Sequence, residues 1–232
     1  MTANLTTIGF DADDTLWQNE QYFRATQERF ASLLADHGDS DDLLNRLQAA
    51  EKRNLGRYGF GIKGFVLSMI ETAIEVSHGD VSSTVIGELL AAGQEMLQYP
   101  VELLPHARDC VERLAKTHRI LLITKGDLLD QERKLAQSGL GDIFDGVEIV
   151  SAKTPEVYLD IFARRGAGPN AAMMVGNSMR SDILPVLHIG ARGVFVPHHL
   201  SWALEHVEPP VGHDRFHEIA HLGHLGDLIA NL

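Results

Sequence analysis

The sequence predicts an α/β protein, in which a doubly wound parallel sheet forms the core and an α-helical domain is inserted after the first strand. Five short apolar runs are continuous rather than alternating, which is typical of parallel strands buried on both faces. Helical patterns separate the last four runs, and this alternation favours an open sheet with right-handed crossovers. The predicted strands are Thr7–Phe10, Arg119–Ile123, Gly146–Val150, Ala172–Val175 and Gly193–Val196. The helices between them are Asp127–Ser138, Pro155–Arg165 and Ser181–Ile189, and another helix, Pro105–Thr117, precedes the second strand.

The long stretch between the first two strands predicts a separate helical domain. It has no strand pattern of its own, and it is too long for a loop in a compact domain. Apolar residues recur at three-to-four-residue spacing over Glu20–His37, Asp41–Asn54, Lys63–Ser77 and Ser82–Leu97. We therefore expect a core domain of residues 1–17 and 101–232 and a helical cap domain of residues 18–100.

Composition limits the partners and the compartment. The 232 residues carry a formal net charge of −12, which argues against binding to nucleic acid or to an anionic membrane. The single cysteine, Cys110, cannot form an internal disulfide and fits a reducing compartment. The N-terminus has no basic region followed by an apolar run, and no window approaches the length needed to span a bilayer. We expect a cytoplasmic protein.

Three carboxylates, Asp11, Asp13 and Asp14, follow the first predicted strand within four positions. Two such charges ~4 Å apart repel by about 4 kcal/mol at an effective dielectric near 20, and a divalent cation would offset this cost. On an extended strand, Asp11 and Asp13 point to the same side, roughly 6–7 Å apart. One carboxylate can then attack a substrate while the other transfers a proton. The alternative interpretation is a turn that leads into an Asp-rich helix N-terminus.

Side chains that can take part in catalysis or in ligand binding also follow three later strands. Thr124 and Lys125 follow the second strand, Lys153 follows the third, and Asn177 follows the fourth. Open parallel sheets bind ligands outside the carboxyl ends of their strands, so we expect these residues to meet there. Taken singly, each has a plainer interpretation, such as a strand-end threonine or a solvated lysine at a helix start. Asp182 could likewise flank a helix N-terminus.

The ordered set resembles the haloacid dehalogenase superfamily, in particular its phosphatase branch. The family's first motif, Asp-x-Asp-x-Thr after an apolar strand, matches Asp11-Ala12-Asp13-Asp14-Thr15. Its second, third and fourth motifs match Thr124, Lys153 and the segment Gly176–Asp182, in the same order. The resemblance implies a Rossmann-like core with a helical cap inserted between the first and second motifs. One position departs from the pattern, because Asn177 stands where the phosphatases usually have Asp.

For catalysis, the resemblance implies hydrolysis of a phosphate ester through an aspartyl-phosphate intermediate. Asp11 would be the nucleophile, and Asp13 would protonate the leaving oxygen and then deprotonate the attacking water. Mg²⁺ would be the cofactor, bound by the Asp11 carboxylate, the Asp13 backbone carbonyl, Asn177 and Asp182.

For the substrate, the resemblance implies a small phosphorylated metabolite. Lys153, the Thr124 hydroxyl and the amide of Lys125 would hold the phosphoryl oxygens. The segment 57–64 mixes glycines, aromatic residues and two cations, and could be a lid loop whose Lys63 meets the rest of the substrate. The alternative for this segment is a flexible surface connection. A closing cap favours a small substrate over a phosphoprotein.

Two other functions remain open. A metal-independent hydrolase of carbon–halogen bonds would explain Asn177, because the dehalogenases of this superfamily lack the metal and carry an Asn nearby. Asp13 argues against this function, since a halide leaves without a proton. A catalytically idle binding module is the second alternative, and the intact Asp11, Asp13 and Lys153 argue against it. The C-terminal histidines, which we interpret as surface or partly packed residues rather than zinc ligands, are His213, His217, His221 and His224.

Overall fold

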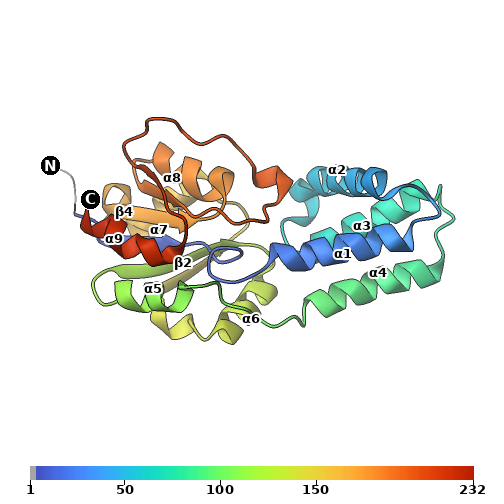
Figure 1. The fold of residues 1–232 in the computed structure, drawn as a ribbon, viewed down its shortest axis with the longest axis horizontal. Coiled ribbons are helices and arrows are strands. Elements are labelled where there is room, and N and C mark those ends of the chain that lie inside the picture. Colours follow the sequence, from blue (N-terminus) through green and yellow to red (C-terminus); the bar gives the residue numbers. More distant parts are fainter. Residues whose placement is uncertain (1–3) are drawn as a thin grey trace. The chain divides into compact units, whose positions relative to one another are not determined.

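A computed structural model describes residues 4–232 and contains a six-stranded sheet with the order β3-β2-β1-β4-β5-β6 (Figure 1). Every pairing in the sheet is parallel, which confirms the predicted fold class. Its strands are β1 (Thr7–Phe10), β2 (Arg119–Lys125), β3 (Gly146–Val150), β4 (Ala172–Gly176), β5 (Arg192–Phe195) and β6 (Phe216–Glu218). The sequence analysis did not predict β6, because three residues are too few to show a periodic pattern.

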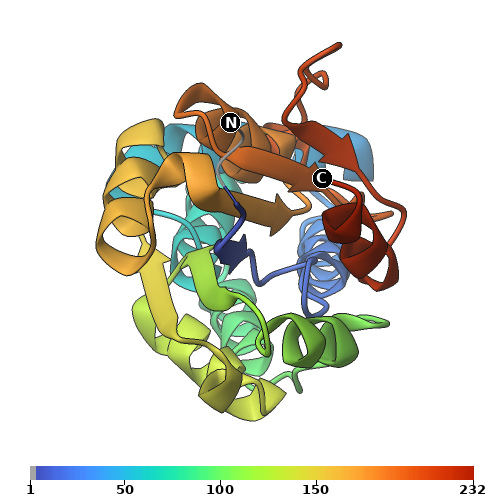
Figure 2. The same ribbon diagram turned by 90° about the vertical axis from the view of Figure 1, so that its left-hand side faces the viewer.

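Helices cover both faces of the sheet, as Figure 2 shows. Alternate residues of each central strand point to opposite faces. Ile8, Leu122 and Val175 pack on one face, whereas Leu121, Ile123 and Met174 pack on the other. This arrangement explains why the strands are continuous apolar runs. The helices of this region are α5 (Ala107–Leu114), α6 (Leu128–Ser138), α7 (Pro155–Arg165), α8 (Leu184–His188) and α9 (Leu225–Ala230).

The predicted helix Ser181–Ile189 differs from the structure at its start. The chain forms a wider π-helical turn over Met179–Ile183, and the regular helix α8 begins only at Leu184. Pro185 accounts for the difference, because it has no N–H to bond the carbonyl of Ser181. The buried hydroxyl of Tyr158 donates to that carbonyl instead, at 3.1 Å. Tyr158 therefore compensates for the proline just beyond the fourth motif.

Contacts divide the chain into two units. The first unit contains residues up to Glu20 together with Val101–Lys125 and Gln131–Leu232, and the second contains Gln21–Pro100 and Gly126–Asp130. The short segment 126–130 groups with the second unit because Asp127 contacts Lys63. The Asp127 carboxylate accepts a bond from the Lys63 backbone N–H at 3.3 Å and lies 3.5 Å from its ammonium. The predicted cap boundaries at residues 18 and 100 stay a prediction.

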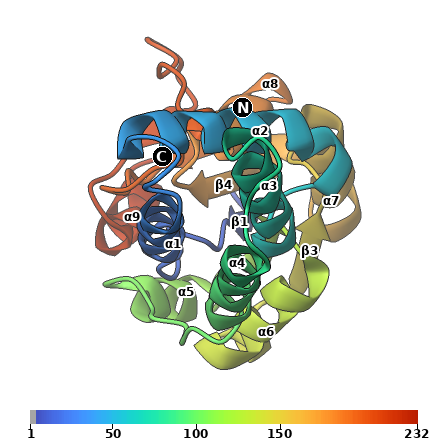
Figure 3. The same ribbon diagram turned by 90° about the vertical axis from the view of Figure 1, so that its right-hand side faces the viewer.

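The second unit has a helical core of its own, drawn from the other side of the molecule in Figure 3. Phe30 of the first helix and Leu34 just after it pack with Leu47, Phe65 and similar buried residues of the next helices. Asp39 and Ser82 cap two of the helices by accepting backbone N–H bonds from Asp42 and Val85. The helices are α1 (Glu20–Leu33), α2 (Ser40–Tyr58), α3 (Ile62–Val76) and α4 (Ser83–Met96).

Two further features concern membrane-spanning helices and the single cysteine. Across residues 4–232, no helix combines the length and the apolar character that crossing a membrane requires. Cys110 is buried in α5, and burial raises the pKa of its thiol to about 12. The thiol is therefore protonated at neutral pH, as is typical of a packing residue rather than a nucleophile.

Candidate active site

A tight loop after β1 carries the first predicted site residues. The backbone N–H of Asp11 donates to Val175 of β4, which continues the sheet by one step. The chain then turns, because Leu16 donates back to the Ala12 carbonyl and Asp14 adopts a left-handed conformation with φ 59°. Aspartate is among the few residues that tolerate this conformation, so the third acid of the motif supports the turn. The Asp14 carboxylate accepts the backbone N–H groups of Asn19 and Glu20 at the start of α1.

Asp11, Lys153 and Asp182 form a buried ion triad at the carboxyl ends of the strands. The Lys153 ammonium donates to the Asp11 carboxylate and, at 2.6 Å, to Asp182 Oδ1. The side chains of Lys153 and Asp182 are each only 1 % exposed. Burial and the nearby Asp182 raise the pKa of Asp11 to about 7, and the ammonium opposes this shift. Burial favours the neutral amine, but the two carboxylates raise the pKa of Lys153 above its ordinary value.

Asn177 faces the same carboxylate from the end of β4. Its side-chain amide lies 3.2 Å from Asp11 Oδ2, from the Asp13 carbonyl oxygen and from the Thr15 hydroxyl. Thr15 in turn donates to Asp11 Oδ2 at 3.1 Å and accepts the Asn177 backbone N–H at 3.0 Å. With its nitrogen inward, the amide donates to this group; with its oxygen inward, it leaves three acceptor oxygens facing one another.

This oxygen set fits Mg²⁺, the metal that the sequence resemblance implies. Octahedral Mg²⁺ binds oxygen at 2.0–2.1 Å, which places neighbouring ligand oxygens about 3 Å apart. The oxygen-inward amide and its two neighbours, Asp11 Oδ2 and the Asp13 carbonyl, lie close to that spacing. Among the described residues, His, Cys, Asp and Glu side chains alone make no group of three suited to a metal, so the set depends on the amide and the carbonyl. Both Asp182 oxygens accept bonds from the protein, because Oδ2 accepts the Ser178 N–H at 2.9 Å.

The Asp13 carboxylate is held by three donors. Trp17 Nε1 and Lys134 Nζ lie 2.8 and 3.0 Å from Oδ1. Gln131 Nε2 lies 2.8 Å from Oδ2. Burial alone would raise the pKa of Asp13, but the Lys134 charge and these hydrogen bonds lower it below its ordinary value. Sequence reasoning missed Gln131 and Lys134, although their spacing of three residues places them on one face of α6.

The remaining predicted residues occupy different settings. Thr124 is 1 % exposed at the end of β2, and its hydroxyl forms no hydrogen bond to any of residues 4–232. Lys125 follows it, and its ammonium bonds Ser181 Oγ at 2.8 Å and Glu205 at 2.5 Å. Lys63 belongs to the second unit, where its side chain is 59 % exposed and paired with Asp127. Its predicted contact with substrate stays a prediction.

Glu205 is a further acidic residue of the first unit that the sequence analysis missed. It lies in a single helical turn, Ala203–Glu205, on the irregular segment between β5 and β6. No periodic pattern marks this segment, so the sequence carries no signal for it. Within residues 4–232, the C-terminal histidines join no group of three metal-binding side chains. His221 stacks on His106 at a centroid distance of 4.6 Å, and its ring is tilted against that of His224 at 4.0 Å.

Comparisons with known proteins show which family this chain is similar to. A family model described as haloacid dehalogenase-like hydrolase matches residues 5–190. A curated glyceraldehyde 3-phosphate phosphatase from Methanothermobacter thermautotrophicus is 24 % identical over 227 residues, 88 % of this chain and 91 % of the relative. A haloacid dehalogenase-like family hydrolase from Xanthomonas campestris has a TM-score of 0.87 and 36 % identity over 98 % of this chain and 91 % of that one. A 2-haloacid dehalogenase from Pseudomonas syringae shares the fold, with a TM-score of 0.61 and 20 % identity over 98 % of this chain and 99 % of that one.

Proposed function

The chain belongs to the haloacid dehalogenase-like hydrolases, and from this premise we propose that it is a Mg²⁺-dependent phosphatase acting through an aspartyl-phosphate on Asp11. The observation that carries the proposal is the second carboxylate, Asp13, fixed by three donors two residues after Asp11. An alkoxide leaving from phosphorus needs a proton, and a halide leaving from carbon does not. A carboxylate fixed at this position can transfer such a proton, so it serves phosphate ester cleavage.

The chain's own residues account for both half-reactions. Asp11 attacks phosphorus and forms a P–O bond while the bond to the leaving oxygen breaks. Asp13 passes a proton to that oxygen, and it must first take this proton up, because its three donors and its lowered pKa leave it ionised at rest. Asp13 then takes a proton from the water that cleaves the aspartyl-phosphate, which restores Asp11. Lys153, the hydroxyl of Thr124 and the backbone N–H of Lys125 offer donors to the phosphoryl oxygens. When bound, Mg²⁺ neutralises part of the negative charge shared by the carboxylate and the phosphoryl group.

For the metal, we propose that Asp11 Oδ2, the Asp13 carbonyl and Asn177 Oδ1 are the direct ligands. Asp182, the fourth predicted ligand, has both oxygens committed to Lys153 and Ser178. We therefore propose that Asp182 acts on the metal indirectly, through a bridging water and by holding Lys153 in position.

Asn177→Asp tests this ligand set. A carboxylate at this position restores a negative charge next to the metal, so the Mg²⁺ concentration for half-maximal activity should fall at least about tenfold. Without metal, the same carboxylate faces Asp11 Oδ2 and the Asp13 carbonyl and loses the amide donor, so the variant should melt at a lower temperature than wild type. Activity measured against Mg²⁺ concentration checks the first effect, and thermal melting with EDTA and with Mg²⁺ checks the second. Equal Mg²⁺-induced stabilisation in variant and wild type would remove Asn177 from the site.

We propose a small phosphomonoester as the class of substrate, and the catalytic residues by themselves support no narrower assignment. The relative from Methanothermobacter is named for a small phosphorylated aldehyde, which supports the same class. The net charge of −12 makes nucleic acid or an anionic membrane an unfavourable partner. The single cysteine, Cys110, which allows no internal disulfide, supports a cytoplasmic location.

Metal-independent dehalogenation is the second candidate, and Asn177 is the observation that favours it. The Lys153 ammonium also contacts Asp11 directly, so the nucleophile has a cation beside it even without metal. A dehalogenase gives no role to Asp13, however, and leaves its three donors without a purpose.

One assay separates the two functions. The protein is incubated with an aryl phosphate and with 2-chloropropionate, each with Mg²⁺ and with EDTA, and released phosphate and chloride are measured. We expect phosphate release that requires Mg²⁺ and no chloride release. Chloride release in EDTA, without phosphate release, would replace the phosphatase by a dehalogenase.

A further inference from the structure

A cation and two hydroxyls surround the Glu205 carboxylate in the first unit. Lys125 Nζ lies 2.5 Å from Glu205 Oε1. Ser181 Oγ lies 2.5 Å from Oε2, and Ser178 Oγ donates to the same oxygen. Both carboxylate oxygens thus accept hydrogen bonds, and the side chains of Lys125 and Glu205 are only 16 % and 15 % exposed.

Residues of this cluster are neighbours in the chain of residues in the candidate active site. Lys125 directly follows Thr124, and Ser178 directly follows Asn177. The Ser178 N–H donates to Asp182, which holds Lys153 at 2.6 Å. Residues that surround the Glu205 carboxylate therefore sit one position along the chain from residues that we assign to phosphate and metal.

The surroundings of Glu205 have the chemistry of a carboxylate-binding site. One ammonium and two hydroxyls offer charge-assisted hydrogen bonds to both oxygens of a single carboxylate. Burial alone would raise the pKa of Glu205, but Lys125 and the two serines lower it, so the side chain stays an anion. The donors come from β2 and from the start of the π-helical turn after β4, whereas the carboxylate comes from the segment between β5 and β6.

We propose that Lys125, Ser178 and Ser181 form a carboxylate subsite beside the phosphate site, and that Glu205 fills this subsite from within the chain. The protein therefore selects phosphomonoesters whose leaving group is uncharged and discriminates against phosphorylated carboxylic acids. This inference rests on the proposed phosphatase function and names its substrate class.

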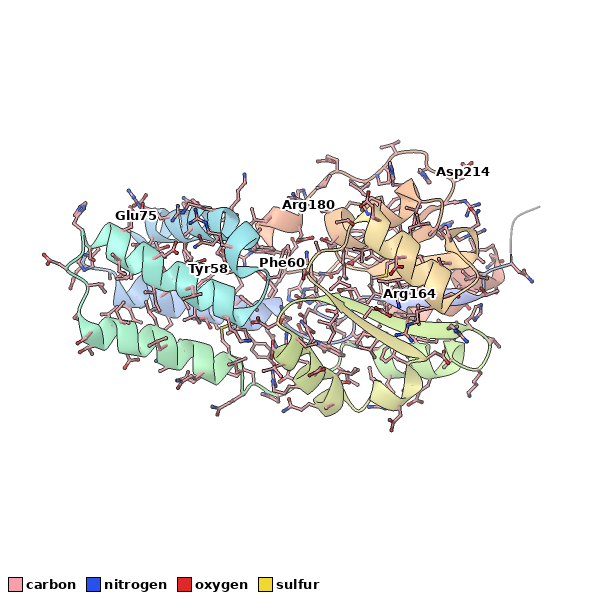
Figure 4. The ribbon with its side chains drawn as sticks, turned by 180° about the vertical axis from the view of Figure 1, so that it is seen from behind. Tyr58, Phe60, Glu75, Arg164, Arg180 and Asp214 are labelled. Carbon is pink, nitrogen blue, oxygen red and sulfur yellow. The ribbon has the colours of Figure 1, made fainter. Side chains whose placement is uncertain are left out.

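Because Glu205 belongs to the same chain, its carboxylate competes effectively with the carboxylate of a substrate for this subsite. An intramolecular ligand acts at an effective concentration of about millimolar or higher, so a dilute acidic substrate does not displace it. A second anchor holds the tether, because Arg180, labelled in Figure 4, donates to the carbonyl of Leu204 at 3.0 Å. The carbonyl belongs to the residue just before Glu205, which limits the movement of the carboxylate.

Two substrates of matched size test the proposal. Phosphoglycolate and 2-hydroxyethyl phosphate differ in one group, a carboxylate against a hydroxymethyl, and kcat/KM is measured for both. We expect Glu205→Ala to raise the ratio of phosphoglycolate to 2-hydroxyethyl phosphate at least about tenfold, through a lower KM for the acid. Glu205→Gln, which removes the charge and keeps the volume, should give a smaller rise and reports on the charge alone. The double variant Glu205→Ala, Lys125→Met should lose the gain, because the ammonium is gone.

Binding of glycolate provides a readout without turnover. At constant ionic strength, glycolate should raise the melting temperature of Glu205→Ala, but not that of wild type or of the double variant. This result supports the subsite even if no phosphomonoester is hydrolysed, in which case only the phosphatase proposal fails. Hydrolysis with an unchanged substrate ratio and no glycolate effect in Glu205→Ala would overturn the subsite and leave the phosphatase standing. A gain that survives Lys125→Met would overturn it as well.

Discussion

Asp11→Asn is expected to abolish turnover of phosphomonoesters, with kcat lower by at least ~10⁴-fold. An amide nitrogen replaces one carboxylate oxygen and the negative charge is lost, so no nucleophile remains to form the aspartyl-phosphate. The fold should survive, because the remaining side-chain oxygen can still accept the bond from Thr15 that Asp11 Oδ2 accepts now. Phosphate release from an aryl phosphate in saturating Mg²⁺ measures the loss, and circular dichroism verifies the fold.

Asp109→Asn is the matched control for this variant. It makes the same chemical change at an exposed position of α5, and it should leave kcat within about twofold of wild type. Mass spectrometry adds a direct readout, since wild type stopped during turnover should carry a phosphoryl group on Asp11 and the Asn variant should carry none. Activity of Asp11→Asn comparable to wild type would refute the covalent mechanism.

Much of the fold follows from patterns that a sequence displays directly. The strands of the sheet centre are continuous apolar runs because both of their faces are covered, and this pattern needs no knowledge of tertiary contacts. The inserted helices are amphipathic over two or more turns each. The start of α8 could not be predicted in the same way, because it depends on a tertiary bond from Tyr158 to the carbonyl that Pro185 leaves free.

The residues of the candidate site also differ in whether the sequence alone could predict them. Asp11, Lys153 and Asp182 were predictable as neighbours, since parallel strands bring their carboxyl ends to one edge, and the structure places the three in contact. Gln131 and Lys134 were not, because a polar residue on a helix normally faces water, and these two face inward only through tertiary contacts such as those with Asp13. Glu205 was the hardest of these residues to predict, because an irregular segment has no periodic pattern that indicates which way a side chain points.

Lys153→Met is expected to cause the largest loss of stability, lowering the free energy of unfolding by about 3–5 kcal/mol. The substitution keeps most of the side-chain volume and removes the one ammonium between two buried carboxylates. Asp11 and Asp182 then face each other with no charge between them, in a place where water does not screen them. Urea denaturation in EDTA measures the effect on the chain alone. Lys125→Met is the control, and it should cost less, because it leaves a single carboxylate, Glu205, which two serine hydroxyls still hold, rather than two carboxylates that face each other.

A second substitution separates the lost charge from lost packing. In Lys153→Met, Asp182→Asn, one of the two uncompensated charges is gone, and the amide oxygen can still accept the Ser178 N–H. If charge is the cause, the double variant should recover at least about half of the stability that Lys153→Met loses, and the two substitutions should be strongly non-additive. If the double variant is less stable than Lys153→Met by the full cost of Asp182→Asn alone, then Lys153 acts by packing. In that case the ion triad is not what holds Asp11 in place for attack.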